Sequence, residues 1–400
     1  MNQAATETRL PFWLKGNFGP IYKHTTAESL PVEGPIPAEL NGRYLRIGPD
    51  PKFGHSDHWF LGDGMVHGIE LNAGKVNWYR SRHVKTAAYD RDGDYDVMAG
   101  LGGLDQSLAN THVISHAGKI LALEELHLPY ELTPELDTVG AYDFDGKLKT
   151  GMTAHPKVCG KNGELLFFAY GLAPPYMTYH RASADGELVQ TEQIEVKGPT
   201  MVHDFNVTEN FIIFMDLPLT FDISDLSKPG IPLKWDEDYG ARLGVMPRDG
   251  SNEDVTWYDI DPCYAYHPVN AYEDGDDIVI DVCRSSSVMK QDVQVWPVLH
   301  RWTIDRRAGR VTETPLDDVP VEFPRVPDRL VGQPHRYGYM VELDRKNGSC
   351  GVAVRKHDFV ANSHETFHLA ASQRCGEPVF VPAEGAVNED DGYLLFFVYD

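Results

Sequence analysis

Three histidines occupy equivalent places in three similar segments of the chain, at His155, His203 and His267. Each is followed by a short polar or glycine-containing turn and then by an apolar run. The three runs are Leu165–Tyr170, Phe211–Met215 and Ile278–Val282. Imidazole nitrogens bind iron, copper, nickel or zinc. A symmetric fold that repeats this segment would bring the three side chains to one point, so the sequence predicts a shared metal site.

A competing metal chemistry is offered by the HExxH pattern of His364, Glu365 and His368. In zinc hydrolases this pattern lies on a helix, which places both histidines on one face beside the glutamate. The flanking residues show no helical periodicity. As a strand, the segment would turn Glu365, Phe367 and Leu369 inward and the histidines outward. We predict a strand and keep the zinc hydrolase as an alternative.

The segments that must position the three histidines have the pattern of short β-strands. From Leu40 onward, apolar runs of about four to seven residues alternate with Gly, Asn, Asp and Pro. The turn Ala117–Lys119, for example, leads into Ile120–Leu123. Long amphipathic helices are nearly absent. Repeated turn–strand units predict an all-β fold with a radially repeated sheet, a β-propeller, and a β-sandwich array is the alternative.

The domain organisation follows from the same pattern. Prolines interrupt any regular element over residues 1–40, which predicts an irregular N-terminal lead-in. No change of composition marks a boundary after that point. We therefore expect one β-propeller domain over residues 41–400.

The acidic composition excludes some classes of partner. The 400 residues carry a formal net charge of −24 and give a pI near 5.0, whereas nucleic acids and anionic membranes are bound by basic faces. We expect no nucleic-acid partner and at most a peripheral contact with a membrane. Residues 1–9 are polar and lack the apolar core of a signal peptide. Five scattered cysteines without a CxxC pair are typical of reduced thiols, which predicts a cytoplasmic protein.

Several motifs in order resemble the carotenoid cleavage oxygenase family, which includes the retinal pigment epithelial membrane protein-like, apocarotenoid and lignostilbene enzymes. The resemblance extends from about Asn41 to Asp400. It is carried by Asn41–Pro49, Trp59–His67, Thr153–Lys157, His203–Phe205, His267–Asp274, Glu377–Pro382 and Glu389–Gly392. Because so many motifs agree in order, the resemblance is specific.

The resemblance implies a seven-bladed β-propeller with Fe(2+) on its axis, held by four histidines. His155, His203 and His267 match three of these ligands. The fourth would follow the strand after Glu389–Gly392, and the given sequence stops at Asp400. We therefore expect that the chain is truncated, that its last blade is incomplete and that the fourth ligand lies beyond Asp400.

The resemblance also assigns residues around the metal. Three glutamates that orient the ligands fall on Glu125, Glu322 and Glu377. A carboxylate that accepts the Nδ1–H of an imidazole leaves Nε2 facing the metal. Thr111 falls beside the open coordination position, and Phe60 is a candidate for the substrate or O₂ pocket.

The activity that the resemblance implies is dioxygenase cleavage. O₂ adds across a conjugated C=C bond and gives two carbonyl products, with no organic cofactor. A third hypothesis is a non-catalytic propeller that serves as a binding module.

Substrates of the family divide into carotenoids or apocarotenoids and phenolic stilbenes or phenylpropenes. Lignostilbene-cleaving members carry a lysine just before the first glutamate, where this chain has Glu124. A glutamate does not stabilise a phenolate, which favours a small apolar carotenoid-like substrate. The compact segment Val97–Leu108 offers little apolar surface for docking on a membrane, so a phenolic substrate is the alternative.

Overall fold

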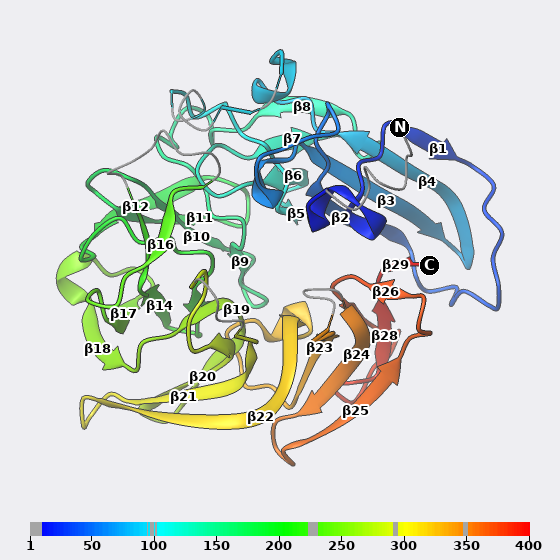
Figure 1. Ribbon diagram of the computed structural model, residues 1–400. Helices are drawn as coiled ribbons and strands as arrows, with labels where there is room; N and C mark the ends of the chain where they lie inside the picture. The colour runs from blue at the N-terminus through cyan, green and yellow to red at the C-terminus, as the bar shows by residue number, and fades with distance from the viewer. Residues whose placement is uncertain are drawn as a thin grey trace. The chain divides into compact units, whose positions relative to one another are not determined.

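The computed structural model describes residues 10–93, 95–96, 100, 102–222, 231–290, 295–346 and 351–400, which form short antiparallel strands and few helical turns (Figure 1). They divide into two compact units. The first unit comprises Met1–Ala154, Ala184–Leu188 and Ser224–Pro232. The second comprises His155–Ser183, Val189–Ile223 and Leu233–Asp400.

The described helical turns are short 3₁₀ segments that connect strands. They are η1 (Phe12–Leu14), η2 (Gly16–Phe18), η3 (Trp59–Leu61), η4 (Ala88–Asp90), η6 (Asn252–Asp254) and η7 (Asp328–Leu330). Within the described ranges, none of the helices has the length and apolarity needed to cross a membrane.

The first unit contains two four-stranded antiparallel sheets, ordered β1-β4-β3-β2 and β5-β6-β7-β8. β1, from the predicted lead-in, pairs with β4, so part of residues 1–40 joins a sheet. The strands are β1 (Thr25–Ala27), β2 (Gly42–Pro49), β3 (Gly64–Asn72), β4 (Lys75–His83), β5 (His112–His116), β6 (Lys119–Leu123), β7 (Tyr130–Leu132) and β8 (Thr138–Ala141).

Two hairpins of the first unit use the same turn chemistry. The β3–β4 turn has Ala73 at φ 47° and Gly74 at φ 76°, and the β5–β6 turn has Ala117 at φ 48° and Gly118 at φ 76°. Two successive residues with positive φ make a tight turn whose twist matches that of the paired strands. Glycine meets this demand at the second position without steric cost. The predicted turn at residues 117–119 is confirmed.

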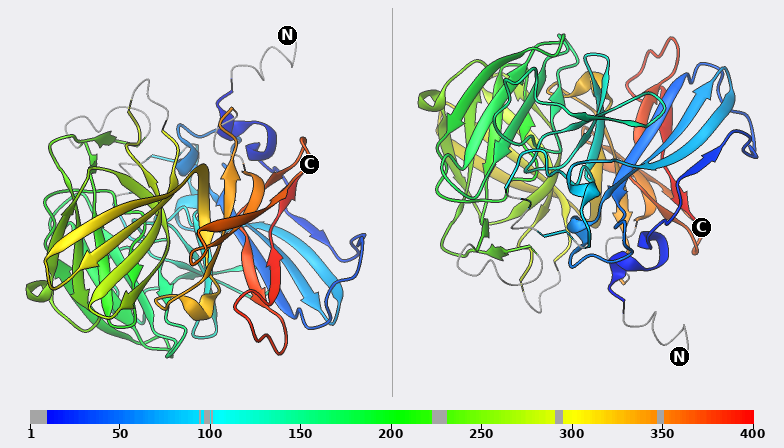
Figure 2. Two further views of the ribbon diagram at one scale, coloured as in Figure 1. Left: turned by 90° about the horizontal axis from the view of Figure 1, so that it is seen from below. Right: turned by 90° about the horizontal axis from the view of Figure 1, so that it is seen from above.

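The second unit contains the sheets β12-β11-β10-β9 and β13-β14-β17-β18, the pairs β15-β16 and β27-β28, and one larger sheet. In the larger sheet, residues 310–315 of β22 pair with β21, and residues 321–325 pair with β23. One strand of 16 residues therefore serves two groups of strands, β19-β20-β21-β22 and β22-β23-β24-β25. Figure 2 shows β21 and β22 as a long twisted ribbon in yellow.

The strands of the second unit have the following bounds. They are β9 (Lys157–Val158), β10 (Leu165–Tyr170), β11 (Met177–Ala182), β12 (Leu188–Ile194), β13 (Asn206–Val207), β14 (Phe211–Asp216), β15 (Leu219–Phe221), β16 (Leu233–Trp235), β17 (Ala241–Pro247), β18 (Thr256–Ile260), β19 (Tyr264–Asp274), β20 (Asp277–Ser285), β21 (Val298–Asp305), β22 (Arg310–Arg325), β23 (Tyr337–Leu343), β24 (Gly351–Asp358), β25 (Ser363–His368), β26 (Arg374–Cys375), β27 (Val379–Pro382), β28 (Gly392–Leu395) and β29 (Val398–Tyr399).

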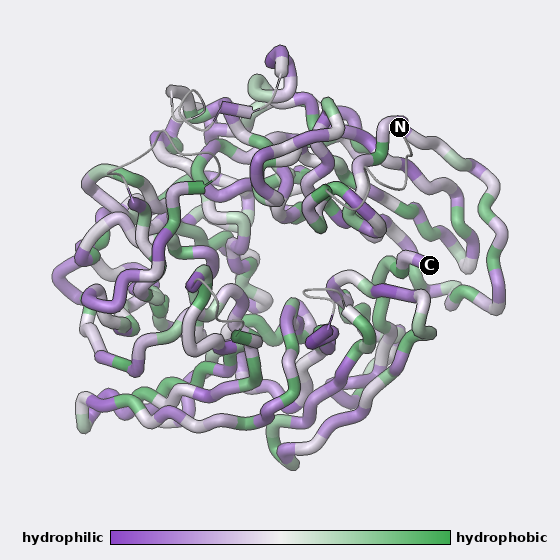
Figure 3. Tube along the Cα trace, viewed as in Figure 1, coloured by the Kyte–Doolittle hydropathy of each residue, from purple (hydrophilic) through white to green (hydrophobic). Residues whose placement is uncertain are grey.

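The three predicted apolar runs are confirmed as strands β10, β14 and β20. Every residue of β10 is buried, as are most residues of β14 and β20. A strand covered on both faces needs apolar side chains in succession, which explains why these runs do not alternate. Figure 3 shows such apolar stretches separated by hydrophilic connections.

The HExxH segment forms strand β25, and the helix that a zinc hydrolase requires is not present there. The predicted strand is confirmed, but the predicted inward orientation of Glu365 and Phe367 is wrong. Leu369, which directly follows the strand, packs against a buried cluster as predicted. Glu365 is exposed and Phe367 is 63% exposed. Thr366 is instead the least exposed residue of the strand, and its hydroxyl donates to Glu342 at 3.0 Å. The buried Arg355–Glu342 pair on the neighbouring strands favours a polar side chain at this position.

The cysteines among the described residues are unpaired and buried. They are Cys159, Cys263, Cys283 and Cys375. Cys350 lies outside the described residues.

A buried histidine makes the stability of the second unit sensitive to acid. His180 on β11 stacks on Phe167 at 4.9 Å, its Nδ1 lies 3.0 Å from the hydroxyl of Thr191, and burial lowers its pKa from 6.5 to about 4. Between about pH 6.5 and pH 4 the unfolded chain binds a proton that the folded chain does not, so stability falls as the pH falls. We expect His180→Gln to reduce the slope of unfolding free energy against pH by about 1.4 kcal/mol per pH unit in this window.

Urea unfolding at a series of pH values measures this slope. His368→Gln, on the exposed strand β25, is the matched control and should leave the slope unchanged. An unchanged slope in His180→Gln would show that the ring is protonated in the folded chain as readily as in the unfolded one.

Candidate metal centre

The three histidines of the sequence pattern stand at the starts of three hairpins of the second unit. His155 precedes β9, His203 precedes β13, and His267 lies within β19. The register of β19 against β20 is irregular between Ala265 and Pro268. A proline has no backbone N–H to give to the ladder, and such an irregularity re-aims the neighbouring side chain. Beside Pro268, the side chain of His267 therefore need not follow the regular in-and-out alternation of side chains along β19.

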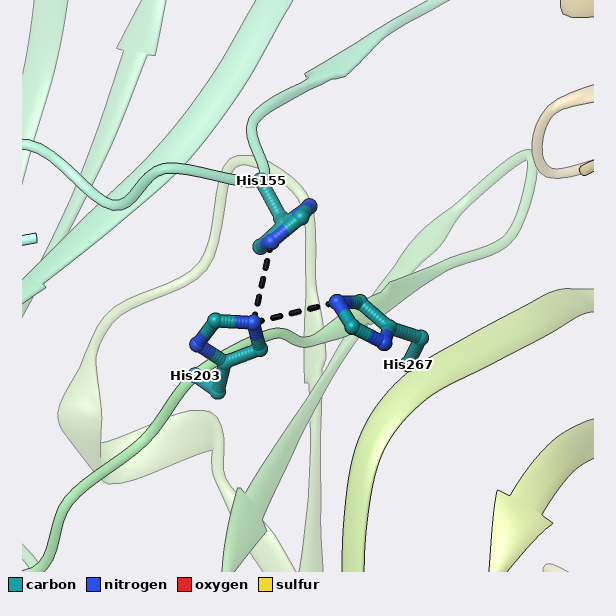
Figure 4. Close-up of side chains that lie close together, drawn as sticks. All are labelled: His155, His203 and His267. Carbon is teal, nitrogen blue, oxygen red and sulfur yellow. Dashed lines mark hydrogen bonds between the residues drawn. The ribbon is translucent and has the colours of Figure 1, made fainter. Parts of the chain in front are cut away.

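The structure brings the three imidazoles together (Figure 4). Nε2 of His203 lies 3.1 Å from Nε2 of His155 and 3.1 Å from Nε2 of His267. The ring centroids are separated by 4.6 to 4.8 Å. The ligand atoms of the three residues all lie within 4.8 Å of one another. Among the described residues, this is the group of histidine, cysteine and carboxylate side chains that could hold a metal ion.

Hydrogen bonds among the three imidazoles cannot satisfy all three Nε2 atoms. A neutral imidazole nitrogen either donates one hydrogen or offers one lone pair. Nε2 of His203 faces two other Nε2 atoms, so it can form one good hydrogen bond and not two. A shared cation would accept all three lone pairs. The nitrogens are close enough together for one cation to be shared at ordinary metal–imidazole distances of about 2.0–2.1 Å.

Glu322 on β22 fixes the orientation of His267. Its Oε2 lies 2.5 Å from Nδ1 of His267 and accepts the backbone N–H of Phe323 at 2.7 Å. Burial lowers the pKa of His267, but the charge and hydrogen bond of Glu322 outweigh this effect, so the pKa is raised overall. A ring that donates from Nδ1 to a carboxylate presents the lone pair of Nε2 to the other histidines.

Glu377, in the loop between β26 and β27, belongs to the same electrostatic environment. Its Oε1 accepts from Nη1 of Arg325 at 3.1 Å. Its charge also contributes to the raised pKa of His267. The structure therefore places Glu322 and Glu377 in the electrostatic environment of His267.

The remaining predicted residues, Glu125, Thr111 and Phe60, lie in the first unit. Glu125 is buried in the bend after β6. The hydroxyl of Thr111 donates to Oδ1 of Asn110 at 2.9 Å, and Nδ2 of Asn110 donates to the carbonyl of Phe60 at 2.8 Å. Asn110, which the sequence did not single out, therefore joins Thr111 to Phe60.

Comparisons with known proteins identify the family of the chain. A family model described as retinal pigment epithelial membrane protein matches residues 18–400. A carotenoid cleavage oxygenase of Mycobacterium tuberculosis is 38% identical over 460 aligned positions, which cover 98% of this chain and 90% of that protein. The chain belongs to the carotenoid cleavage oxygenase family. The prediction of an oxygenase is confirmed at the level of the family.

Solved structures of similar proteins have the same fold. The lignostilbene dioxygenase of Pseudomonas brassicacearum superposes with a TM-score of 0.88 at 29% identity, covering 97% of this chain and 91% of that one. The cobalt-substituted apocarotenoid oxygenase of Synechocystis gives a TM-score of 0.84 at 26% identity, covering 95% and 88%. The predicted all-β propeller is confirmed, and the β-sandwich alternative is not.

Glu124, the residue on which the prediction of the substrate class rests, is held inside its own loop. Its Oε2 lies 2.6 Å from Nδ1 of His127, and its Oε1 accepts the backbone N–H of Leu126 at 3.2 Å. Burial raises the pKa of Glu124, but His127 and the backbone donors more than reverse this effect, so the pKa is lowered. The carboxylate is therefore engaged by the protein itself.

An ion pair links two of the histidine segments, and sequence reasoning assigned it no role. Nζ of Lys157 lies 2.6 Å from Oδ1 of Asp204. Burial raises the pKa of Asp204, against the opposing effect of Lys157. Lys157 is two residues after His155, and Asp204 directly follows His203. Both residues occur in the motifs that carried the resemblance, but only the tertiary structure shows that they pair.

We expect Glu322→Gln to weaken metal binding by about 10–100-fold, because the amide no longer takes the Nδ1 proton of His267 as a carboxylate does. Metal content per chain after dialysis against graded chelator measures the loss. Glu131→Gln removes a partly exposed carboxylate that pairs with Lys119 in the first unit and is the control. Equal metal retention in Glu322→Gln and wild type would contradict an orienting role for Glu322.

A second prediction concerns the buried pair. Lys157→Met leaves the buried Asp204 without its partner, which costs about 3–5 kcal/mol. The exposed pair of Lys161 and Glu209 links the same two segments and contributes about 0–1 kcal/mol. We expect a large loss of thermal stability and of metal content in Lys157→Met and almost none in Lys161→Met. Similar effects in the two variants would show that burial of the ion pair is unimportant.

Proposed function

We propose that the chain is an Fe(2+)-dependent oxygenase that cleaves a conjugated C=C bond with O₂. The observation that carries the proposal is the convergence of three Nε2 atoms, one of them set by Glu322. An all-imidazole site suits iron, copper, nickel or zinc, and the cobalt-substituted relative supports a divalent metal in this fold. Iron is favoured within this set because the matched relatives are named as oxygenases. Fe(2+), when bound, supplies the activation of O₂.

The reaction balances without a further reactant. The C=C bond and the O–O bond break, and two C=O bonds form, so both oxygen atoms of O₂ are accounted for in two carbonyl products. No protein group needs to transfer a proton in the net reaction. The work of the chain is therefore to hold the histidines, bind the alkene and exclude water.

The residues around the histidines fit this role. The ring of Tyr266 lies 5.4 Å from that of His203, and the ring of Phe323 lies 5.3 Å from that of His267. Phe323 has φ 55°, which is uncommon for an aromatic residue and is held in place by its backbone N–H bond to Glu322. These aromatic rings cover the cluster with apolar surface. Glu322 and the Arg325–Glu377 pair keep the charges near it compensated.

We infer a carotenoid or apocarotenoid substrate. The Mycobacterium tuberculosis relative is named for carotenoid cleavage, and the engagement of Glu124 by His127 leaves no lysine-like contact for a phenol. A hydroxystilbene is the second candidate, because a lignostilbene dioxygenase is among the matching structures.

Residues 97–99 and 101 of the segment expected to limit membrane docking lie outside the described residues. The fourth histidine and the cytoplasmic location stay predictions.

Replacement of the central histidine tests the function. We expect His203→Ala to lose both bound iron and cleavage activity, because Nε2 of His203 contacts both other ligands. Iron-loaded protein is incubated with an apocarotenal and, separately, with a hydroxystilbene. Mass spectrometry of the aldehyde products identifies the substrate class and the broken bond.

The HExxH residues supply the control for this experiment. The double variant His364→Ala, His368→Ala changes exposed side chains of β25 and should keep wild-type iron content and activity. Loss of activity in the double variant together with full activity in His203→Ala would overturn the proposal. Wild-type protein that binds no iron and cleaves neither substrate would favour the binding-module hypothesis.

A further inference from the structure

A groove in the first unit has no role in the proposed oxygenase reaction. It has a volume of about 430 Å³ and is lined by Tyr22, Lys23, His24, Lys52, His83 and Tyr89. These are two ammonium groups, two imidazoles and two phenols, and none of the described lining residues is acidic. In a chain of net charge −24, this is a local excess of basic groups.

The two imidazoles of the groove are held against each other. Nε2 of His24 accepts the backbone N–H of His83 at 3.1 Å and lies 3.2 Å from Nδ1 of His83. Nε2 of the buried His83 donates to the carbonyl of Asp50 at 3.0 Å. Because Nε2 of His24 acts as an acceptor, its neutral ring carries the hydrogen on Nδ1. That hydrogen has no acceptor among the residues that the structure describes.

The two lysines also keep unused donors. Nζ of Lys52 donates to the carbonyl of Tyr89 at 2.7 Å and lies 4.5 Å from the centre of the Tyr89 ring and 5.1 Å from that of Phe53. Neither Lys52 nor the exposed Lys23 forms an ion pair with a described residue. An ammonium group has three N–H donors. Both lysines therefore offer hydrogen bonds to a ligand.

Around His24, the neighbouring basic groups outnumber the acidic ones. Burial lowers the pKa of His24, and His83, Arg82 and Lys85 lower it further, against a smaller opposing effect of Asp50. The carboxylate of Asp50 is already engaged, because its Oδ2 accepts the backbone N–H of Ile21 at 2.7 Å. Its Oδ1 lies 3.6 Å from Nε2 of His83. Asp63 accepts the backbone N–H of Lys52 at 2.8 Å, but its carboxylate is paired with Arg91. The ammonium groups of the two lysines therefore have no ion-pair partner among the described residues.

We propose that this groove binds the phosphate group of a small phosphorylated molecule. Two lysines match the charge of about −1.5 to −2 that a phosphate monoester carries near neutral pH, whereas a carboxylate carries a single charge. Lysine binds phosphate as a point charge, and the Nδ1–H of His24 adds a directed donor. The volume is within the roughly 300–1,000 Å³ of small-molecule sites. The groove is larger than a phosphate group, and the rings of Tyr22 and Tyr89 offer surface for the rest of the molecule.

Calorimetric titration of the full chain with inorganic phosphate and with phenyl phosphate tests the proposal, at an ionic strength held constant with sodium chloride. We expect saturable binding of one phenyl phosphate per chain. Lys52→Met and Lys23→Met should each weaken this binding at least about tenfold, the effect of losing one charged contact. Lys23 is exposed and forms no ion pair with the described residues, so its replacement does not threaten the fold.

Lys75→Met, at the exposed start of β4 in the same sheet, is the matched control and should bind as wild type does. Absence of saturable binding of both phosphates, or equal losses in Lys75→Met and the two groove variants, would overturn the proposal. Acetate binding as tight as phosphate binding would contradict the choice of a phosphate. Sedimentation with phosphatidylcholine vesicles that contain phosphatidate distinguishes a lipid headgroup. Vesicle binding that depends on Lys23 and Lys52, without binding of free phosphates, would contradict a small-molecule ligand.

Discussion

The mutual approach of three imidazole nitrogens is the constraint on which the second unit depends. Lone pairs that point at a common centre repel one another, and a single proton can join only two of them. The arrangement of His155, His203 and His267 is therefore costly for the protein alone and favourable with a cation at its centre. Folding free energy from elsewhere in the unit holds the three segments in place.

That free energy comes from ordinary β-structure with a few polar reinforcements. The buried strands β10, β14 and β20 follow the three histidines and anchor each of their hairpins in the core. Each of the three histidines lies outside regular strand pairing, either just before a strand or at an irregularity in the register. Glu322 then sets the tautomer of His267, and the Lys157–Asp204 pair joins the first two segments. Buried charges of this kind are tolerated because each has a partner.

The first unit uses polar side chains for a different purpose. Asn110 bridges the segments of Phe60 and Thr111, and Glu124 is neutralised by His127. In both cases the hydrogen bonds of a polar side chain hold a loop in its conformation. The basic groove is the exception, because two lysines there have no carboxylate partner among the described residues. Binding of an anionic ligand would explain why these lysines are not paired with carboxylates in a protein of net negative charge.

Sequence alone predicted much of this protein. Short apolar runs and glycine turns predicted the strands, as the Ala117–Lys119 turn shows, because strand and turn formation depend on neighbouring residues. The repeated histidine offset predicted the cluster, because similar hairpins in a symmetric fold place equivalent residues alike. The family motifs added Glu322 and Glu377. The orientation of β25 was predicted wrongly, because the inward face of an edge strand depends on which side chains its neighbour offers, here Arg355 and Glu342.

Only the tertiary structure decided which groups pair across long separations in the chain. The partners of Lys157, Glu124 and Asn110, and the joining of the lead-in to β4, involve geometry that no local pattern encodes. The groove is of the same kind, since Lys23 and Lys52 become neighbours only when the lead-in lies beside the first sheet. The sequence by itself determined the strands, the turns and the metal-binding residue types, because these depend on local chemistry. The folded chain decided which charges are compensated and which remain for a ligand, because electrostatic pairing depends on distance in space.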